Sequence, residues 1–301
     1  MTHMRTRRSF GDISFTTLNY AFFALFTFLC VFPFYYLFIN TISSNDLSAR
    51  GLITWYPREI HFENYMQILK LKGLSQAAFV SVARTVIGTA ATVLCSAFLG
   101  FLFTKKKMWA RSFWYRFLVI TMYFNAGIIP WYVVMMKLHM TNNFLAYILP
   151  MIVSPFYIIL VKTFVESIPE VLQESAEMDG AGTMTIFWKI ILPLIKPIAA
   201  TIAIFAAVTQ WNSFIDTVFL MTDQTYYTLQ FVLYKYLNES NSLAAIIRSG
   251  GGTANIDLSK MQTATSVRTT VSMIVVIPIM LVYPFFQRYF VKGIMIGAVK
   301  G

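Results

Sequence analysis

Residues 167–197 read SIPEVLQESAEMDGAGTMTIFWKIILPLIKP and connect two long apolar runs of the chain. Pro169 suits the first turn of a helix, because that position needs no backbone N–H. The acidic residues of this first helix lie in its early turns, where the helix dipole favours negative charge: Glu170, Glu174 and Glu177. Asp179-Gly180 then has the composition of a turn that ends the helix.

A second short helix is predicted after this turn. Phe187, Ile190 and Ile191 are spaced as on one face of a helix, and Pro193 and Pro197 are expected to end it. The segment therefore predicts a compact helix–turn–helix hairpin at a membrane surface. Such a hairpin either docks in a groove of a partner protein or lies on the membrane as a plain connector, and the periodicity favours neither.

The composition of the chain points to a membrane protein. Of its 301 residues, 57% are hydrophobic and only 12% are charged, whereas soluble domains carry about 25% charged residues. The mean hydropathy is +0.62. The formal net charge of +11 does not indicate a nucleic-acid partner, because the basic residues cluster between apolar runs, as orientation signals do.

The apolar runs are long enough to cross a bilayer as helices. A spanning helix needs about 20 apolar residues, and backbone groups in lipid must pair within the helix. We therefore predict an all-α, polytopic membrane protein with about six transmembrane helices. The third should be kinked or broken at Gly127 and Pro130. The predicted spans are residues 19–39, 76–104, 113–136, 144–165, 198–220 and 269–291.

Basic residues beside the spans predict the orientation of the helices. With six spans, the main basic clusters all fall on one side, which should be cytoplasmic and should hold both termini. These residues are Arg5, Arg7, Arg8, Lys105, Lys106, Lys107, Arg111, Lys189, Lys196, Lys292 and Lys300. On the opposite side we expect an extracytoplasmic loop at residues 221–268. Residues 61–72 on that side have apolar side chains at helical spacing, which predicts a short interfacial helix.

Residues 174–193, ESAEMDGAGTMTIFWKIILP, resemble the EAA motif of ABC importer permeases. The motif combines Glu-Ala-Ala, a later Asp-Gly-Ala and an apolar ending that closes in Leu-Pro. The matching residues are Glu174, Ala176, Asp179, Gly180, Ala181, Phe187, Ile190, Leu192 and Pro193. Ser175 replaces the first alanine, one small residue for another. This resemblance favours the docking interpretation of the hairpin.

The resemblance extends over most of the chain. Residues 124–130 (FNAGIIP), 210–214 (QWNSF) and 284–301 (PFFQRYFVKGIMIGAVKG) are similar to the carbohydrate branch of these permeases. That branch includes LplC-like subunits and importers of alginate and other oligosaccharides. The resemblance implies a type I ABC importer permease fold. It also implies a single transmembrane permease domain over residues 1–301 that imports a carbohydrate in the bacterial cytoplasmic membrane.

In that family the EAA hairpin is a coupling helix that sits in a cleft of a separate ATPase subunit. By resemblance, the coupling contact here comprises Glu174, Ala176, Asp179, Gly180 and Ala181. The chain has no G-x-x-x-x-G-K-[ST] motif, so ATP and Mg²⁺ should be bound by partner ATPase subunits, and the chain itself should not be an enzyme. The implied partners are two ATPase copies, a paralogous permease subunit and an extracytoplasmic solute-binding protein. No cofactor or metal is expected in this chain.

Polar residues inside the predicted spans are candidates for solute contacts, because lipid makes them costly. The candidates for a substrate path are Asn125, Gln210, Trp211, Asn212 and Asp216. Trp beside amide and carboxylate groups suits a sugar, whose ring faces stack and whose hydroxyls form hydrogen bonds. The same residues equally suit contacts between helices or an interfacial belt. Arg84 is expected to snorkel or to lie at an interface rather than to bind substrate.

A second class of function stays open from the residues alone. A secondary transporter or channel for a small polar solute would also be polytopic and apolar. That class favours internal repeats and several intramembrane charges for ion coupling. The predicted spans contain few acidic residues, of which Asp216 is the main one, and no internal repeat is found.

Overall fold

The computed structural model describes residues 10–70, 73–248 and 264–293, and these residues form helices and loops without a β-strand. Part of the predicted outer loop, residues 249–263, and the family-like tail at 294–301 lie outside the described residues. The chain forms two units. The first unit comprises Met1–Leu69 and Leu237–Ile274, and the second unit comprises Lys70–Tyr236 and Val275–Gly301.

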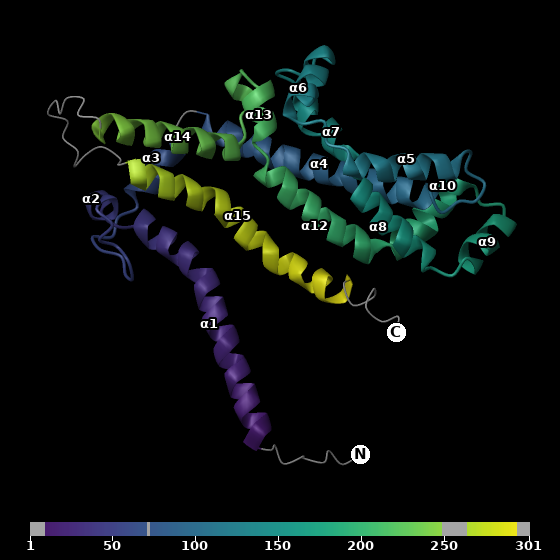
Figure 1. Ribbon diagram of the computed structural model, residues 1–301, viewed down its shortest axis with the longest axis horizontal. Helices are drawn as coiled ribbons and strands as arrows, with labels where there is room; N and C mark the ends of the chain where they lie inside the picture. Colours follow the sequence, from purple (N-terminus) through teal and green to yellow (C-terminus); the bar gives the residue numbers. More distant parts are fainter. Residues whose placement is uncertain (1–9, 71–72, 249–263, 294–301) are drawn as a thin grey trace. The chain divides into compact units, whose positions relative to one another are not determined.

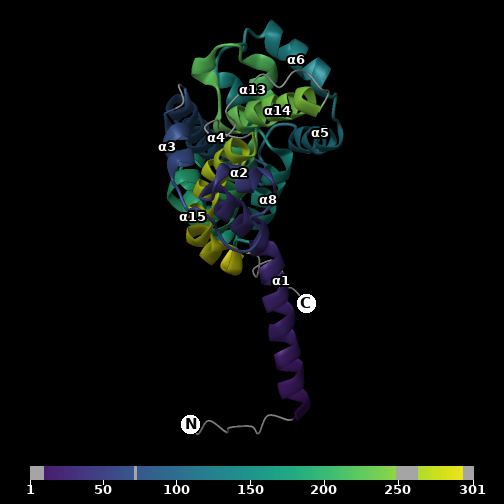
Figure 2. The same cartoon turned by 90° about the vertical axis from the view of Figure 1, so that its left-hand side faces the viewer.

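The first unit contains the long helix α1 (Phe10–Thr41) and two short helices, α2 (Asn45–Ala49) and α3 (Glu63–Leu69) (Figure 2). Most of α1 is apolar and exposed. Its last turn is buried by polar contacts with the following loop: Ser48 Oγ donates to Asn40 Oδ1 at 2.8 Å, and Asn64 Nδ2 donates to the Thr41 carbonyl at 2.9 Å. Helix α3 confirms the short helix predicted within residues 61–72.

The second unit is arranged around α4 (Leu74–Leu102), which packs against α8 (Pro155–Glu166) and α12 (Lys196–Asn212). Helix α6 lies beside α13 in this unit, as Figure 1 and Figure 2 both show. Helices α14 (Leu229–Arg248) and α15 (Ala264–Gly293) contribute residues to both units. The remaining elements are α5 (Arg111–Tyr123), α6 (Ile128–Lys137), η1 (Phe144–Tyr147), α7 (Leu149–Ile152), α8 (Pro155–Glu166), α9 (Val171–Met178), α10 (Thr183–Ile186), η2 (Phe187–Ile191), α11 (Leu192–Leu194), α12 (Lys196–Asn212), α13 (Ile215–Leu220) and η3 (Gln224–Tyr226).

A stripe of small residues lets neighbouring helices approach α4 closely. Gly88, Thr92, Ser96 and Gly100 recur every four residues and are all buried. A Cβ on Gly100 would lie 2.6 Å from the Val161 side chain of α8. Transmembrane helices associate through such small residues, because their backbones can then come into contact. The stripe therefore explains why α4 occupies the centre of the second unit.

The predicted spans are broken more often than the sequence indicated. Within the described residues, three helices are long and apolar enough to cross a membrane: α1, α4 and Thr265–Val282 within α15. The fourth predicted span is a pair bent by 47° between Ile152 and Pro155. The fifth, predicted as one helix over 198–220, is wrong in that form, since α12 ends at Asn212 and α13 begins at Ile215. A second bent pair consists of Thr183–Leu194 and Lys196–Asn212, at 80°. If each bent pair crosses once, the described part of the chain has up to five such spans.

The third predicted span is divided between α5 and α6. The break was expected at Gly127, and Gly127 has a φ of +82° directly before α6. A positive φ is readily adopted by glycine because it has no Cβ. With this divided pair as one more crossing, the helices remain consistent with the predicted count of six.

Candidate functional site

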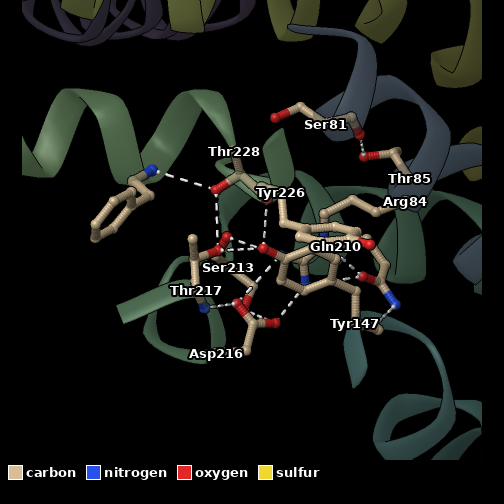
Figure 3. Close-up of polar contacts among 11 residues, drawn as sticks. Ser81, Arg84, Thr85, Tyr147, Gln210, Ser213, Asp216, Thr217, Tyr226 and Thr228 are labelled. Carbon is tan, nitrogen blue, oxygen red and sulfur yellow. Dashed lines mark hydrogen bonds and ion pairs between the residues drawn. The ribbon is translucent and has the colours of Figure 1, made fainter. Parts of the chain in front are cut away.

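A buried ion pair joins α4 to the break between α12 and α13. Arg84 Nη2 lies 2.6 Å from Asp216 Oδ2, and Nη1 lies 3.1 Å from Oδ1 (Figure 3). The side chains are 1% and 6% exposed, respectively. Each residue is thereby neutralised by the other, which is the condition under which charges persist inside a membrane protein.

The guanidinium of Arg84 uses its full hydrogen-bonding capacity. Besides the two bonds to Asp216, Nε and Nη2 donate to Gln210 Oε1 at 3.2 and 3.1 Å, and Nη1 donates to the Ser213 carbonyl at 3.3 Å. A guanidinium has five N–H donors, and all five are thus satisfied. The Ser213 carbonyl is free to accept because the helix stops there. Arg84 therefore holds the end of α12 at this break.

Tyr147 of η1 adds an aromatic ring to the buried cluster formed by Arg84, Asp216 and Gln210. Its ring centroid lies 4.3 Å from Arg84 Cζ, a cation–π contact that adds to the ion pair. Its hydroxyl donates to the Tyr226 carbonyl at 2.6 Å and accepts a bond from Thr217 Oγ1 at 3.1 Å. Tyr147 thereby ties η1 to α13 and to η3, so one side chain fixes three elements (Figure 3).

Both carboxylate oxygens of Asp216 have further partners. Oδ1 accepts from the Thr217 N–H at 2.9 Å, and Oδ2 accepts from Ser213 Oγ at 3.2 Å. These bonds stabilise the first turn of α13, where the helix dipole also favours an acidic residue. In this arrangement both oxygens of the Asp216 carboxylate already accept hydrogen bonds from protein groups. Its proposed contact with a solute remains a prediction.

Arg84 does not snorkel but lies at an interface between helices, the second of the two placements expected from the sequence. Its side chain is buried between helices of the second unit rather than extended to a membrane surface. No local pattern predicts the Arg84–Asp216 pair, because its two members are 132 residues apart. Sequence reasoning also missed Tyr147, Ser213 and Thr217, since hydroxyl residues are common in transmembrane helices and no spacing marks these three.

The five residues predicted for the substrate path do not converge on one point. Gln210 and Asp216 belong to the buried cluster. Trp211 Nε1 donates to the Val275 carbonyl at 3.2 Å, which joins α12 to α15. Asn212 accepts a bond from Gln230 Nε2 at 2.9 Å. Asn125 Oδ1 accepts from the Gly127 N–H at 2.9 Å, so it stabilises the turn between α5 and α6.

The EAA-like hairpin has the helix–turn–helix form that the sequence predicted. Helix α9 ends at Met178, and Gly180 has a φ of +81° in the turn. Ala176 and Ala181 pack against the buried core formed around Phe101 and Phe187, and the Ala181 N–H donates to the Ala176 carbonyl at 2.9 Å. The two alanines thus anchor the turn to the second unit.

The second helical segment does not end at Pro193. Its helical turns continue to Leu194 and meet α12 at an angle of 80°, with the break at Ile195. Pro197 lies in the first turn of α12. The segment thus ends between Pro193 and Pro197, as the sequence predicted, one residue beyond Pro193. In the first turn of α12 the missing N–H of Pro197 costs no hydrogen bond.

Basic residues of the loop between α4 and α5 neutralise two of the four acidic residues of the hairpin, which are Glu170, Glu174, Glu177 and Asp179. Lys105 Nζ lies 2.9 Å from Glu177 Oε1, and Lys106 Nζ lies 3.1 Å from Glu170 Oε1. The hydrogen bond and charge of Lys105 lower the pKa of Glu177. Among the residues that the structure describes, Glu174 and Asp179 have no ion-pair partner, and both are exposed. The hairpin therefore presents two carboxylates without a counter-ion, Glu174 in α9 and Asp179 in the turn.

Exposed apolar side chains lie in the same helix as Glu174. Val171, Leu172 and Met178 are 65%, 46% and 88% exposed. Apolar residues gathered on one exposed surface are typical of a protein–protein contact. An exposed carboxylate beside them adds a charge that can select a partner. The hairpin thus has the surface of a docking element.

Comparison with known proteins identifies the family of the whole chain. Residues 2–296 match the family described as "Binding-protein-dependent transport system inner membrane component". The polygalacturonan/rhamnogalacturonan transport system permease protein YtcP of Bacillus subtilis (strain 168) is 30% identical over 95% of this chain and 98% of its own length. Protein LplC of the same organism is 30% identical over 91% of this chain and 90% of its own length.

A solved structure has the same fold. One chain in the crystal structure of a bacterial ABC transporter involved in the import of the acidic polysaccharide alginate superposes with a TM-score of 0.81. It is 27% identical in sequence, and the match covers 94% of this chain and 98% of that one. The fold is that of a type I ABC importer permease, and this protein belongs to the family of inner membrane components of binding-protein-dependent transport systems.

Proposed function

We propose that this chain is the permease subunit that carries an oligosaccharide across the bacterial cytoplasmic membrane, driven by ATP hydrolysis in separate subunits. The observation that carries this proposal is the end-to-end match to transport proteins whose names or titles specify carbohydrates. YtcP and the structural neighbour each align over 98% of their own length. A further relative, AraQ of Halalkalibacterium halodurans, is named for arabinooligosaccharides and is 28% identical over 93% of this chain.

The hairpin at 167–197 is the proposed cytoplasmic coupling element. Glu174 offers its free carboxylate to an ATPase subunit, and Asp179 and Gly180 shape the turn. Ala176 and Ala181 hold the hairpin on the core, so a movement of α9 is passed to the buried helices behind it. ATP and Mg²⁺ bind to two ATPase copies, and both termini of this chain lie on the same cytoplasmic side.

The remaining partners follow from the type of system. A paralogous permease subunit completes the pathway, and an extracytoplasmic solute-binding protein delivers the sugar on the side of residues 221–268. Residues 1–301 then act as one permease domain. The alternative of a secondary transporter or channel is less well supported, because the family belongs to systems that depend on a binding protein.

Uptake by cells tests the proposed solute class. A strain that lacks this chain should lose uptake of labelled oligosaccharides, and the wild-type chain should restore it. The panel follows the names of the relatives: fragments of polygalacturonan, alginate and arabinan. Unchanged uptake of every member after deletion would contradict the carbohydrate assignment.

Purification tests the proposed assembly. The tagged chain, extracted in mild detergent, should retain a second permease subunit and an ATPase subunit. The variant Glu174→Lys tests the coupling contact: it should retain the permease partner but lose the ATPase. Retention of no ATPase by the wild-type chain would contradict the coupling proposal.

A further inference from the structure

One of the three consecutive lysines after α4 differs from its neighbours in burial. The side chain of Lys105 is 19% exposed, whereas those of Lys106 and Lys107 are 77% and 93% exposed. All three face acidic residues of the hairpin: Lys105 and Lys107 pair with Glu177 at N–O distances of 2.9 and 3.7 Å, and Lys106 pairs with Glu170 at 3.1 Å. Exposed ion pairs contribute little, because water competes for both charges and salt screens them. Of the three lysines, Lys105 is therefore the one whose ion pair can hold the hairpin in place.

Two contacts fix Lys105 to the end of α4. Its backbone N–H donates to the Leu102 carbonyl at 3.0 Å, which continues the last turn of the helix. Its Nζ lies 5.1 Å from the centroid of the Phe101 ring, a cation–π contact. Phe101 is buried, and its ring stacks on Phe187 of the hairpin with the centroids 5.7 Å apart. Lys105 is thus bound to α4, and its ammonium group extends from α4 to α9.

Glu177 occupies a position that α9 alone does not favour. It lies in the last turn of the helix, next to Met178, rather than in an early turn as the sequence indicated. The partial negative charge at the C-terminal end of a helix repels a carboxylate. Lys105 offsets this repulsion, since its hydrogen bond and its charge lower the pKa of Glu177. The Lys105–Glu177 pair therefore attaches to α4 the end of α9 that leads into the turn.

The two halves of the hairpin are attached to the second unit in different ways. The second half contributes four buried side chains to the core around Phe101: Ile186, Phe187, Ile191 and Ile195. Helix α9 has no buried residue, and the side chains that contact this core beside the turn are the small Ala176 and Ala181. A force on α9 can therefore move it relative to the second half, about the turn at Gly180, unless a further contact holds it. The Lys105–Glu177 pair supplies such a contact.

Helix α4 leads from this contact to the buried ion pair. It is a continuous helix of 29 residues without a proline. Arg84 in the same helix bonds Asp216 and Gln210 at the break between α12 and α13. Coupling between distant sites is carried by rigid helices of this kind and by the bonded networks at their ends. A movement of α4 therefore acts on the break in the fifth predicted span.

We propose that Lys105 is a positioning residue that links the coupling hairpin to α4. When an ATPase subunit moves α9, the Lys105–Glu177 bond passes the movement to α4, and Arg84 passes it to the break between α12 and α13. The proposal rests on the coupling function proposed above. It adds that two steps depend on different residues: Glu174 serves the docking of the ATPase, and Lys105 serves the transmission of its movement.

The variants Lys105→Met and Lys106→Met separate this link from the general charge of the loop. Methionine keeps an unbranched side chain that can pack on Phe101 but has no ammonium group. In proteoliposomes with the complete transporter and sugar-loaded binding protein, the measured quantity is the ATP hydrolysed per sugar imported, with labelled digalacturonate and arabinotriose as probes. Lys105→Met should raise this ratio roughly three- to fivefold, because the ATPase then completes cycles that do not move α4. Lys106→Met should change it by less than about 1.5-fold.

Two further variants distinguish the link from a folding defect. Lys105→Arg keeps the charge and should stay within about twofold of the wild type. Glu177→Gln removes the same ion pair from the side of the hairpin and should raise the ratio as much as Lys105→Met does. The double variant Lys105→Met/Glu177→Gln should be no worse than either single variant, because both changes remove one interaction. Every variant should retain the ATPase subunit on purification, since Glu174 is unchanged.

An unchanged ratio for Lys105→Met, or equal effects of Lys105→Met and Lys106→Met, would overturn the proposed link. Loss of the ATPase subunit from Lys105→Met would also overturn it, because Lys105 would then serve docking. If Lys105→Met does not yield a folded complex, the ratio measured for Glu177→Gln decides in its place. Failure of the proposed function is a separate result: the wild-type complex itself would retain no ATPase subunit or import no sugar of the panel.

Discussion

The guanidinium of Arg84 in α4 and the carboxylate of Asp216 in α13 face each other at 2.6 and 3.1 Å, although the residues are 132 positions apart. The pair sits where the fifth predicted span stops being a helix. Its neighbours Gln210 and Ser213 belong to the end of α12, so the ion pair stabilises a broken helix that hydrophobicity alone would have continued. Gln210 also lines a cavity of about 270 Å³ in the second unit.

Loss of one member of the pair should destabilise the protein strongly. Arg84→Met leaves the Asp216 carboxylate buried without its counter-ion, and Asp216→Leu leaves the guanidinium likewise. Each single change should cost about 3–5 kcal/mol, whereas the double variant should cost less than either. Thermal unfolding of the detergent-solubilised complex measures this difference. Additive losses in the double variant would show that the two groups do not interact.

A methyl group at Gly88 should disturb Gln210. The Cβ of an alanine there would lie 2.5 Å from Gln210 Nε2, a distance that forces the amide to move. Overpacking of this kind costs about 1–3 kcal/mol, and we expect Gly88→Ala to reduce sugar transport as well. Gly11→Ala in α1 is the matched control, because its Cβ would meet no atom within 4 Å. Equal transport by both variants would contradict the role assigned to Gly88.

The turn of the hairpin should depend on one of its two glycines. Gly180 has a φ of +81°, whereas Gly182 has a φ of −72°, and a Cβ at either would meet open space. Only Gly180→Ala therefore strains the backbone, by about 1–2 kcal/mol. We expect Gly180→Ala to weaken ATPase stimulation by loaded binding protein, while Gly182→Ala should behave as the wild type. If Gly182→Ala had the stronger defect of the two variants, the backbone conformation of Gly180 would not determine the function of the turn.

The unpaired carboxylate of Glu174 should matter more for assembly than the paired carboxylate of Glu170. Glu174→Gln removes a charge that no described residue neutralises, while Glu170→Gln removes one that Lys106 already pairs. We expect Glu174→Gln to reduce both ATPase retention on purification and uptake. Binding of sugar by the separate binding protein should be unchanged. A stronger defect from Glu170→Gln would indicate that the docking charge was assigned to the wrong residue.

Local patterns in the sequence predicted much of this architecture. The apolar runs indicated spanning helices because lipid leaves the backbone no alternative to internal pairing. The break at Gly127 and the turn at Gly180 could be predicted because each depends on the properties of one residue and its neighbours. The EAA-like spacing identified the hairpin, whose residues are close in sequence and in space.

Contacts between distant residues could not be predicted in this way. Hydrophobicity continued the fifth span through Ser213, and no local signal linked Arg84 to Asp216 or Gln210. The sequence therefore determined the helical class, the broken third span, the hairpin and the family resemblance. Only the tertiary structure decided that α12 stops at Asn212, that Arg84 is buried, and that Gln210 lines a cavity. The physical reason is that a buried charge is stable only beside its partner, and folding alone brings the two together.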